Sequence, residues 1–88
     1  MKVKYQFFSN EEKQIIKRNF NNRIYEFRKH GKYKKLTQRD LAQRTGLSEK
    51  MVSRFEREDI PEYIYQIIAL EKEMHMSVYE MGTGKKLE

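Results

Sequence analysis

The sequence predicts an all-α domain, and three observations support this prediction. Apolar residues recur every three or four positions along most of the chain, as they do on the buried side of a helix. Ser, Thr and Gly residues stand where these apolar stripes begin and end, as helix caps do. The 88 residues suffice for one domain with a small core, and they include no cysteine for a disulfide or a thiolate metal site.

The first helix is expected over residues 10–30, and Gly31 should end it. Ser9 and Glu12 have the spacing of a capping box, in which each side chain accepts a backbone N–H of the other residue. The helix carries an apolar stripe spaced 4, 4 and 3: Ile16, Phe20, Ile24 and Phe27. Residues 1–9 form an N-terminal arm, for which a short strand and an irregular conformation are both consistent with the pattern.

Two short helices are expected next, over residues 38–44 and 49–57, with Gly46 in the turn between them. Thr37 should cap the first of these helices, with Asp40 three positions on to complete a second capping box, and Ser48 should cap the second helix. Small and apolar residues would pack the two helices across a sharp corner: Leu41, Ala42, Leu47, Val52 and Phe55. The other side of the second helix carries a row of polar and charged residues: Glu49, Lys50, Ser53, Arg54 and Arg57. A helix that presents such a row from a rigid corner fits the DNA major groove.

Two further helices should complete the domain, which we expect to span residues 10–82. Pro61 suits the first turn of a fourth helix, whose apolar stripe would be Ile64, Ile67, Ile68 and Met74. Ser77 and Glu80 form a third capping-box pattern before a fifth helix over residues 78–81. A flexible tail, residues 83–88, should follow. One core should then contain Ile24, Phe27, Leu41, Ala42, Leu47, Val52, Phe55, Ile64, Ile67 and Ile68.

The net charge of +6 is distributed unevenly along the chain. Residues 1–59 carry 16 Lys and Arg against 8 Asp and Glu, whereas residues 60–88 carry 3 against 5. The loop over residues 31–36 contributes three of the lysines: Lys32, Lys34 and Lys35. The charge alone fits a solvated surface equally well. Because it coincides with the two-helix corner, it favours a surface that faces nucleic-acid phosphates.

The stretch TQRDLAQRTGLSEKMVSRFER, residues 37–57, resembles the helix-turn-helix of the Cro/phage-repressor family, also called the xenobiotic-response-element family. Gln38 matches the first position of the motif, Ala42 its small residue and Gly46 its turn. Its core positions are matched by Leu47, Val52 and Phe55. The resemblance implies sequence-specific binding to double-stranded DNA.

The resemblance continues outside the motif and covers roughly residues 19–81. NFNNRIYEFRK, residues 19–29, looks like the family's first helix, and IYQIIALEKEMHMSVYEM, residues 64–81, looks like its fourth and fifth. It therefore implies a five-helix, lambda-repressor-like DNA-binding domain, here with an N-terminal extension. One departure is Glu58, which stands where the family often has a helix-ending glycine, so that either this end is capped differently or the helix runs slightly longer.

The resemblance also implies roles for single residues. In the family, an arginine at the end of the first helix pairs with a glutamate at the end of the third, and Arg28 and Glu56 stand at the matching positions. Gln38 could donate a hydrogen bond to a phosphate or brace the recognition helix. Glu49 could accept from a cytosine or stabilise the start of its own helix.

The candidate DNA contacts fall into two groups. Base contacts are expected from the first two turns of the second motif helix, through Glu49, Lys50, Ser53 and Arg54. Phosphate contacts are expected from residues around the starts of the two motif helices and at the end of the second: Lys32, Lys34, Lys35, Thr37, Gln38, Arg39, Ser48 and Arg57.

The function that follows is transcriptional regulation, with repression by operator occupancy as the simplest mechanism. One helix-turn-helix covers only ~4–6 base pairs, so we expect a homodimer on a palindromic operator. The expected dimer contact lies on the last two helices, with the N-terminal arm as a further element: Met74, Met76, Val78, Tyr79 and Met81. Two alternatives remain open, an antitoxin that holds a toxin partner and represses its own operon, and a module that binds RNA or protein.

Several other classes are not expected from this sequence. It contains no nucleophile–base pattern, phosphate-binding loop or paired catalytic carboxylates, so we expect neither an enzyme nor a cofactor. Two histidines on different helices do not indicate a metal site. No apolar run approaches the ~20 residues of a membrane span, and the N-terminus does not have the pattern of a signal peptide. A cytoplasmic protein is therefore expected.

Overall fold

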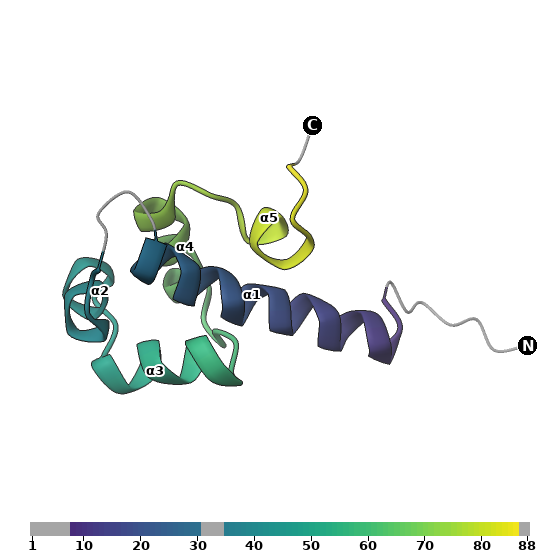
Figure 1. The fold of residues 1–88 in the computed structure, drawn as a ribbon. Coiled ribbons are helices and arrows are strands. Elements are labelled where there is room, and N and C mark those ends of the chain that lie inside the picture. Colours follow the sequence, from purple (N-terminus) through teal and green to yellow (C-terminus); the bar gives the residue numbers. More distant parts are fainter. Residues whose placement is uncertain (1–7, 31–34, 87–88) are drawn as a thin grey trace, which may run out of the picture.

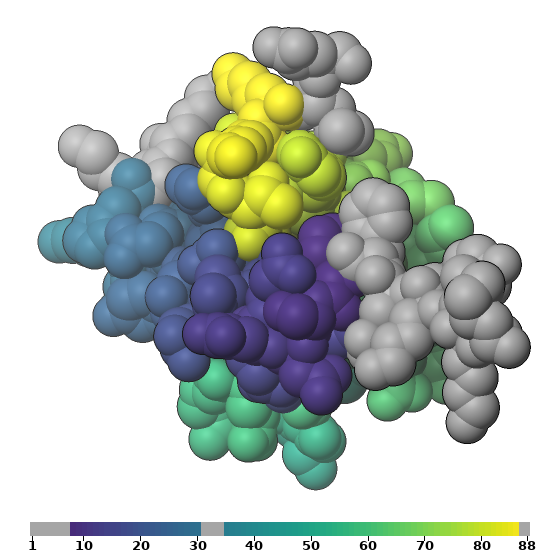
Figure 2. All heavy atoms as spheres, turned by 90° about the vertical axis from the view of Figure 1, so that its right-hand side faces the viewer, coloured from purple at the N-terminus to yellow at the C-terminus, as the bar shows by residue number. Residues whose placement is uncertain are grey.

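The computed structural model describes residues 8–30 and 35–86, and in these ranges the chain is all-helical, as the sequence predicts. The elements are α1 (Asn10–His30), α2 (Gln38–Thr45), α3 (Glu49–Arg57), α4 (Ile64–Met74) and α5 (Val78–Thr83). The long helix α1 is the axis of the molecule, and Figures 1 and 2 show α3 and α5 on opposite sides of it. The expected arm lies outside the described residues, except for its last two positions.

Two predicted capping boxes are confirmed, at the starts of α1 and α2. The Ser9 N–H donates to Glu12 Oε1 over 2.9 Å, and the Glu12 N–H donates to Ser9 Oγ over 3.1 Å. Thr37 and Asp40 make the same pair of bonds, of 2.9 and 3.0 Å. In each box, the backbone N–H that the carboxylate accepts lowers the pKa of Glu12 or Asp40 below its ordinary value.

The starts of the later helices are closed less regularly. Ser48 Oγ accepts the Met51 N–H over 3.0 Å and caps α3 as expected. The box predicted at α5 is only half formed, because Ser77 Oγ accepts from Glu80 but Glu80 makes no return bond. The N-cap residue of α4 is Tyr63, and its side chain makes no capping hydrogen bond. Pro61 precedes this helix instead of lying in its first turn, which corrects the sequence prediction.

The core is built from one side of each helix. Its buried apolar residues are Phe20, Ile24, Leu36, Leu41, Ala42, Val52, Phe55, Leu70, Met74 and Met81. Phe20 and Phe55 meet edge to face, with ring centroids 6.4 Å apart. Phe27 and Leu47 are partly buried against this cluster. The sequence prediction is therefore confirmed for the inward residues of α1, α2 and α3.

The predicted apolar stripe of α4 is wrong at Ile64 and Ile68, whereas Met74 is buried as predicted and Ile67 is half-buried. Ile64 is 73% exposed and Ile68 is 48% exposed, whereas Gln66, Leu70 and Met74 face the core. These buried residues are spaced 4 and 4, which is as helical as the predicted stripe. Helical periodicity therefore identified a stripe but could not identify which of two stripes turns inward. The buried Gln66 Oε1 also finds no hydrogen-bond partner among the described residues.

The helix α5 docks on α1 through a glycine. The Asn19 side chain donates to the Gly82 carbonyl over 2.9 Å, and a Cβ at Gly82 would lie 2.7 Å from Ile16 Cγ2. This close approach also carries Met81 into the core, where it is 1% exposed. Among the described residues, no helix combines the length and the apolar character that crossing a membrane requires.

Candidate nucleic-acid interface

The corner between α2 and α3 depends on Gly46. This residue has φ 75° and ψ 9°, the left-handed conformation that glycine adopts without a steric penalty and other residues rarely adopt. The Thr45 hydroxyl next to it bonds the Leu41 carbonyl over 2.7 Å. The helix α2 therefore stops within one residue, and the chain turns sharply into α3.

A buried ion pair joins α1 to the last turn of α3, and α2 contacts the same pair. Arg28 of α1 donates from Nε to Glu56 Oε2 over 2.6 Å and from Nη2 to Glu56 Oε1 over 2.9 Å. Both side chains are about nine-tenths buried or more, and this bond to Glu56 raises the pKa of Arg28. Gln38 of α2 donates to the same carboxylate over 3.2 Å. The predicted pair is confirmed, and Gln38 braces α3, which was one of its two expected roles.

The same last turn of α3 is also held by an amide from α1. Asn21 Nδ2 donates to the Phe55 carbonyl over 2.6 Å and to the Asp59 carbonyl over 2.8 Å. Asn21 is buried, and its two bonds satisfy carbonyls that a helix end leaves free. This is the different cap that Glu58 required. The sequence analysis did not single out Asn21, although a polar residue three positions before the core residue Ile24 was a usable signal.

The outward side of α3 carries the residues predicted to contact bases. Glu49, Lys50 and Arg54 are exposed, and Ser53 is half-buried. Arg54 Nε lies 2.6 Å from Asp59 Oδ2, so this guanidinium is already paired near the end of the helix. The sequence analysis did not predict this pair. Lys50 forms no ion pair within the described ranges. It could therefore contact a base without first breaking an ion pair, as Arg54 would have to do.

The residues predicted to contact phosphates are only partly brought together. Lys35, Thr37 and Arg39 are exposed near the start of α2, and Ser48 is exposed at the start of α3. The exposed Arg57 donates from Nε to its own helix, to the Ser53 carbonyl, over 3.3 Å. Two further predicted residues, Lys32 and Lys34, lie outside the described residues.

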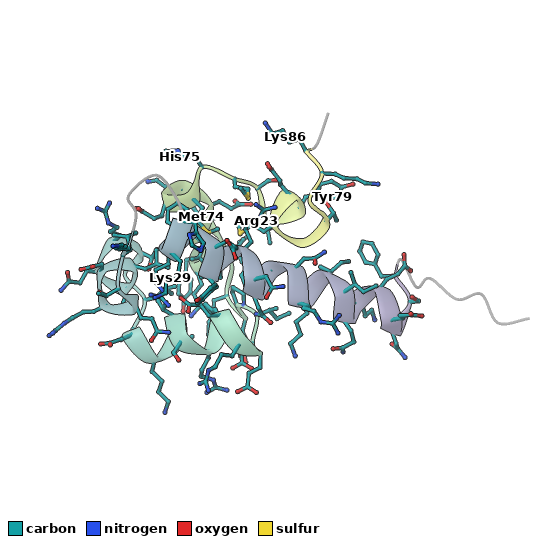
Figure 3. The ribbon with its side chains drawn as sticks, viewed as in Figure 1. Arg23, Lys29, Met74, His75, Tyr79 and Lys86 are labelled. Carbon is teal, nitrogen blue, oxygen red and sulfur yellow. The ribbon has the colours of Figure 1, made fainter. Side chains whose placement is uncertain are left out.

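A hollow of about 580 Å³ lies where α1 ends and α2 and α3 begin. Its lining residues are Arg28, Lys29, His30, Lys35, Leu36, Thr37, Gln38 and Glu49. Figure 3 shows Lys29 near the end of α1 that faces α2. Basic side chains beside the N-terminus of α2 favour an anionic group, because the helix dipole and free N–H groups add to their charge. Lys29 was missed by the sequence analysis, which considered the loop and not the last turn before it.

No protein-family model matches this chain, and no curated protein or solved structure matches it. Among the described residues, no three His, Asp or Glu side chains come together as metal ligands would. The features that bear on function are therefore the chemistry of the α2–α3 corner itself and the sequence resemblance.

Proposed function

We propose that this chain binds double-stranded DNA sequence-specifically through α3 and regulates transcription by occupying an operator. The observation that carries the proposal is the α2–α3 corner, which holds one helix rigidly with an exposed, charged side turned outward. The DNA major groove is wide enough for one α-helix, and its base edges offer hydrogen-bond partners to such a side. The resemblance to the Cro/phage-repressor family supports the same proposal and adds a lambda-repressor-like fold to it.

The bracing of α3 supports this proposal because binding is stronger when the binding element is already ordered. Glu56 ties the last turn of α3 to α1 and α2, and Asn21 ties the same turn to α1. A helix that is anchored in this way and packed into the core through Val52 and Phe55 loses little conformational entropy when it enters a groove. The same bracing fixes which side chains face the bases, and this is what sequence-specific binding requires.

The proposed roles of the basic residues follow from their positions in the fold. Lys50 in the first turn of α3 would bond guanine O6 or N7, and Arg54 would do so after leaving Asp59. Lys35 and Lys29 would approach phosphates at the hollow beside α2. Their attraction to the backbone is independent of sequence and depends on salt. Two copies on a palindromic site would supply the length of contact that one helix lacks.

A random pool of DNA duplexes tests the proposal. The wild-type chain should enrich one short motif after repeated selection, and the double variant Lys50→Ala/Arg54→Ala should lose the preference at its central base pairs. Single-stranded RNA is the competitor. If no motif is enriched, or if RNA displaces the duplex at equal concentration, groove recognition by α3 is refuted.

A further inference from the structure

The solvent side of α4 and the segment before it are unusually apolar. Five large side chains there are exposed: Ile60, Tyr63, Ile64, Tyr65 and Ile68. We call these residues the α4 face. Apolar patches larger than a few hundred Å² are rare on monomeric proteins, and where they occur they usually mark a contact with another molecule.

The α4 face is one surface and not a set of scattered residues. Ile64 and Ile68 are one turn apart, so their side chains are neighbours along the helix. The ring of Tyr65 stacks on that of Tyr63, with centroids 5.3 Å apart and an interplanar angle of 10°. Ile60 lines an apolar groove of about 430 Å³ together with Ile67, which lies one turn from Ile64.

The fold itself does not use this surface. The core takes the other side of α4, through Leu70 and Met74, so the helix is apolar on two sides. An apolar outer side of a helix is normally covered by another element or another molecule. Aromatic residues such as Tyr65 are enriched at the centres of protein interfaces, because they bury a large area and lose little conformational entropy.

The charges around the α4 face are balanced, unlike those of the rest of the chain. Residues 1–59 have a large excess of basic residues, so two copies would repel each other through that part. Beside the α4 face, Arg44 and Glu73 form an ion pair of 3.3 Å, Glu71 accepts a hydrogen bond from the Val78 N–H, and one further acid and one base are present, Glu62 and Lys72. Charge therefore opposes self-association less at this surface than over the basic part of the chain.

The positions of Glu62 and Lys72 make the surface self-complementary. Glu62 lies just before α4, and Lys72 lies in its last turn, one turn beyond Ile68. If two copies of α4 lie antiparallel across a two-fold axis near Ile68, each glutamate approaches the lysine of the other copy. A two-fold contact requires this kind of complementarity, because the same patch must fit itself.

We propose that the α4 face is the surface through which two copies of this chain associate, with their α4 helices antiparallel. It differs from the contact expected from the sequence, of which Met74 and Met81 are buried in the chain's own core, whereas Val78 and Tyr79 are exposed. The inference rests on the proposed function, since an operator with two half-sites needs two copies. The association itself is measurable without DNA.

Sedimentation equilibrium of the full chain tests the inference. The wild type should show twice the 10.8 kDa mass of one chain. Ile68→Glu should show the mass of one chain, because a charge would be buried in the contact. The matched control is Ile15→Glu, which changes an equally exposed isoleucine on α1 and should leave the dimer intact. Circular dichroism must show the same helix content for all three proteins.

A charge-reversal pair then tests the antiparallel arrangement. Glu62→Lys and Lys72→Glu should each weaken self-association about tenfold, since every dimer exchanges two attractive contacts for two repulsive ones. An equimolar mixture of the two variants should associate at least as well as the wild type, because both contacts of the mixed dimer are again attractive. A mixture that stays monomeric would refute the arrangement.

Two other results would overturn the inference as a whole. One is a wild type with the mass of a single chain, and the other is an Ile68→Glu variant that is as dimeric as Ile15→Glu. If the wild type were monomeric and its α4 face bound a different protein, such as a toxin, the surface would belong to that partner. Neither result would affect the proposed DNA binding, which is tested separately by the enrichment of a motif from the random pool of duplexes.

Discussion

The helices α3 and α4 have similar lengths, 9 and 11 residues, and both turn one side to the same core. Their outward sides differ. α3 presents charged residues such as Lys50 and Arg54, whereas α4 presents Ile64 and Ile68. α3 is also capped by a side chain and braced at its last turn, and α4 begins without a side-chain cap. One packing rule thus positions two surfaces whose chemistry suits different partners, a polyanion for α3 and an apolar protein surface for α4.

The largest expected difference between the two helices concerns stability. Phe55→Ala removes a buried ring from the inward side of α3 and should lower the free energy of unfolding by about 3–5 kcal/mol. Ile64→Ala on α4 should change it by less than about 0.5 kcal/mol, because Ile64 is mainly in water. Urea unfolding should be measured at a concentration where the chain is monomeric, since association would add to stability. Equal losses for the two variants would remove the distinction between the buried and the outward side.

The two ion pairs of α3 should also differ in how much they stabilise the fold, with the buried pair contributing more. Glu56→Ala leaves the buried Arg28 unpaired and should cost about 3 kcal/mol. Asp59→Ala breaks a pair of similar length that is partly solvated, and it should cost less than about 1 kcal/mol. Thermal unfolding of both variants provides the comparison. If Asp59→Ala were the more damaging change, α3 would be held mainly by the Arg54–Asp59 pair and not by the Arg28–Glu56 pair with α1.

The inward side of α4 should be improved by a single change. Gln66 is buried and its Oε1 accepts no hydrogen bond from a described residue. Replacement by methionine, of similar shape, removes the unsatisfied acceptor and should raise the free energy of unfolding by about 1 kcal/mol. Calorimetry of Gln66→Met should therefore show a higher Tm. A lower Tm would mean that the amide has a partner outside the described residues.

The smallest effect should come from the start of α2 and should depend on pH. Thr37 lowers the pKa of Asp40 in the folded protein, so the charged carboxylate stabilises the fold above its unfolded pKa. This contribution is lost as the pH falls through the lowered pKa. Asp40→Asn should therefore be less stable than the wild type at neutral pH. In strong acid the free energies of unfolding of the two proteins should become equal. A difference that is independent of pH would show that the charge has no part in the cap.

The contrast between α3 and α4 also explains what the sequence could predict. On α3 the inward residues are apolar and the outward ones are charged, so periodicity alone placed Val52 and Phe55 correctly. On α4 both sides are apolar, and the choice between Ile64 and Leu70 depended on how the preceding loop rotates the helix. The bonds of Asn21 and the Arg54–Asp59 pair join residues through tertiary contacts or past a helix end, and neither periodicity nor capping patterns describe such contacts.

The central claim is that α3 reads bases while the start of α2 holds phosphates. The direct measurement is binding of Lys50→Ala and Lys35→Ala to the selected operator and to a scrambled duplex, each at several salt concentrations. Lys50→Ala should weaken operator binding by about 1–3 kcal/mol and scrambled binding much less. Lys35→Ala should weaken both about equally and reduce the salt dependence by about one phosphate contact. If Lys50→Ala lowered both affinities by the same factor, Lys50 would be a phosphate contact and α3 would not be the recognition helix.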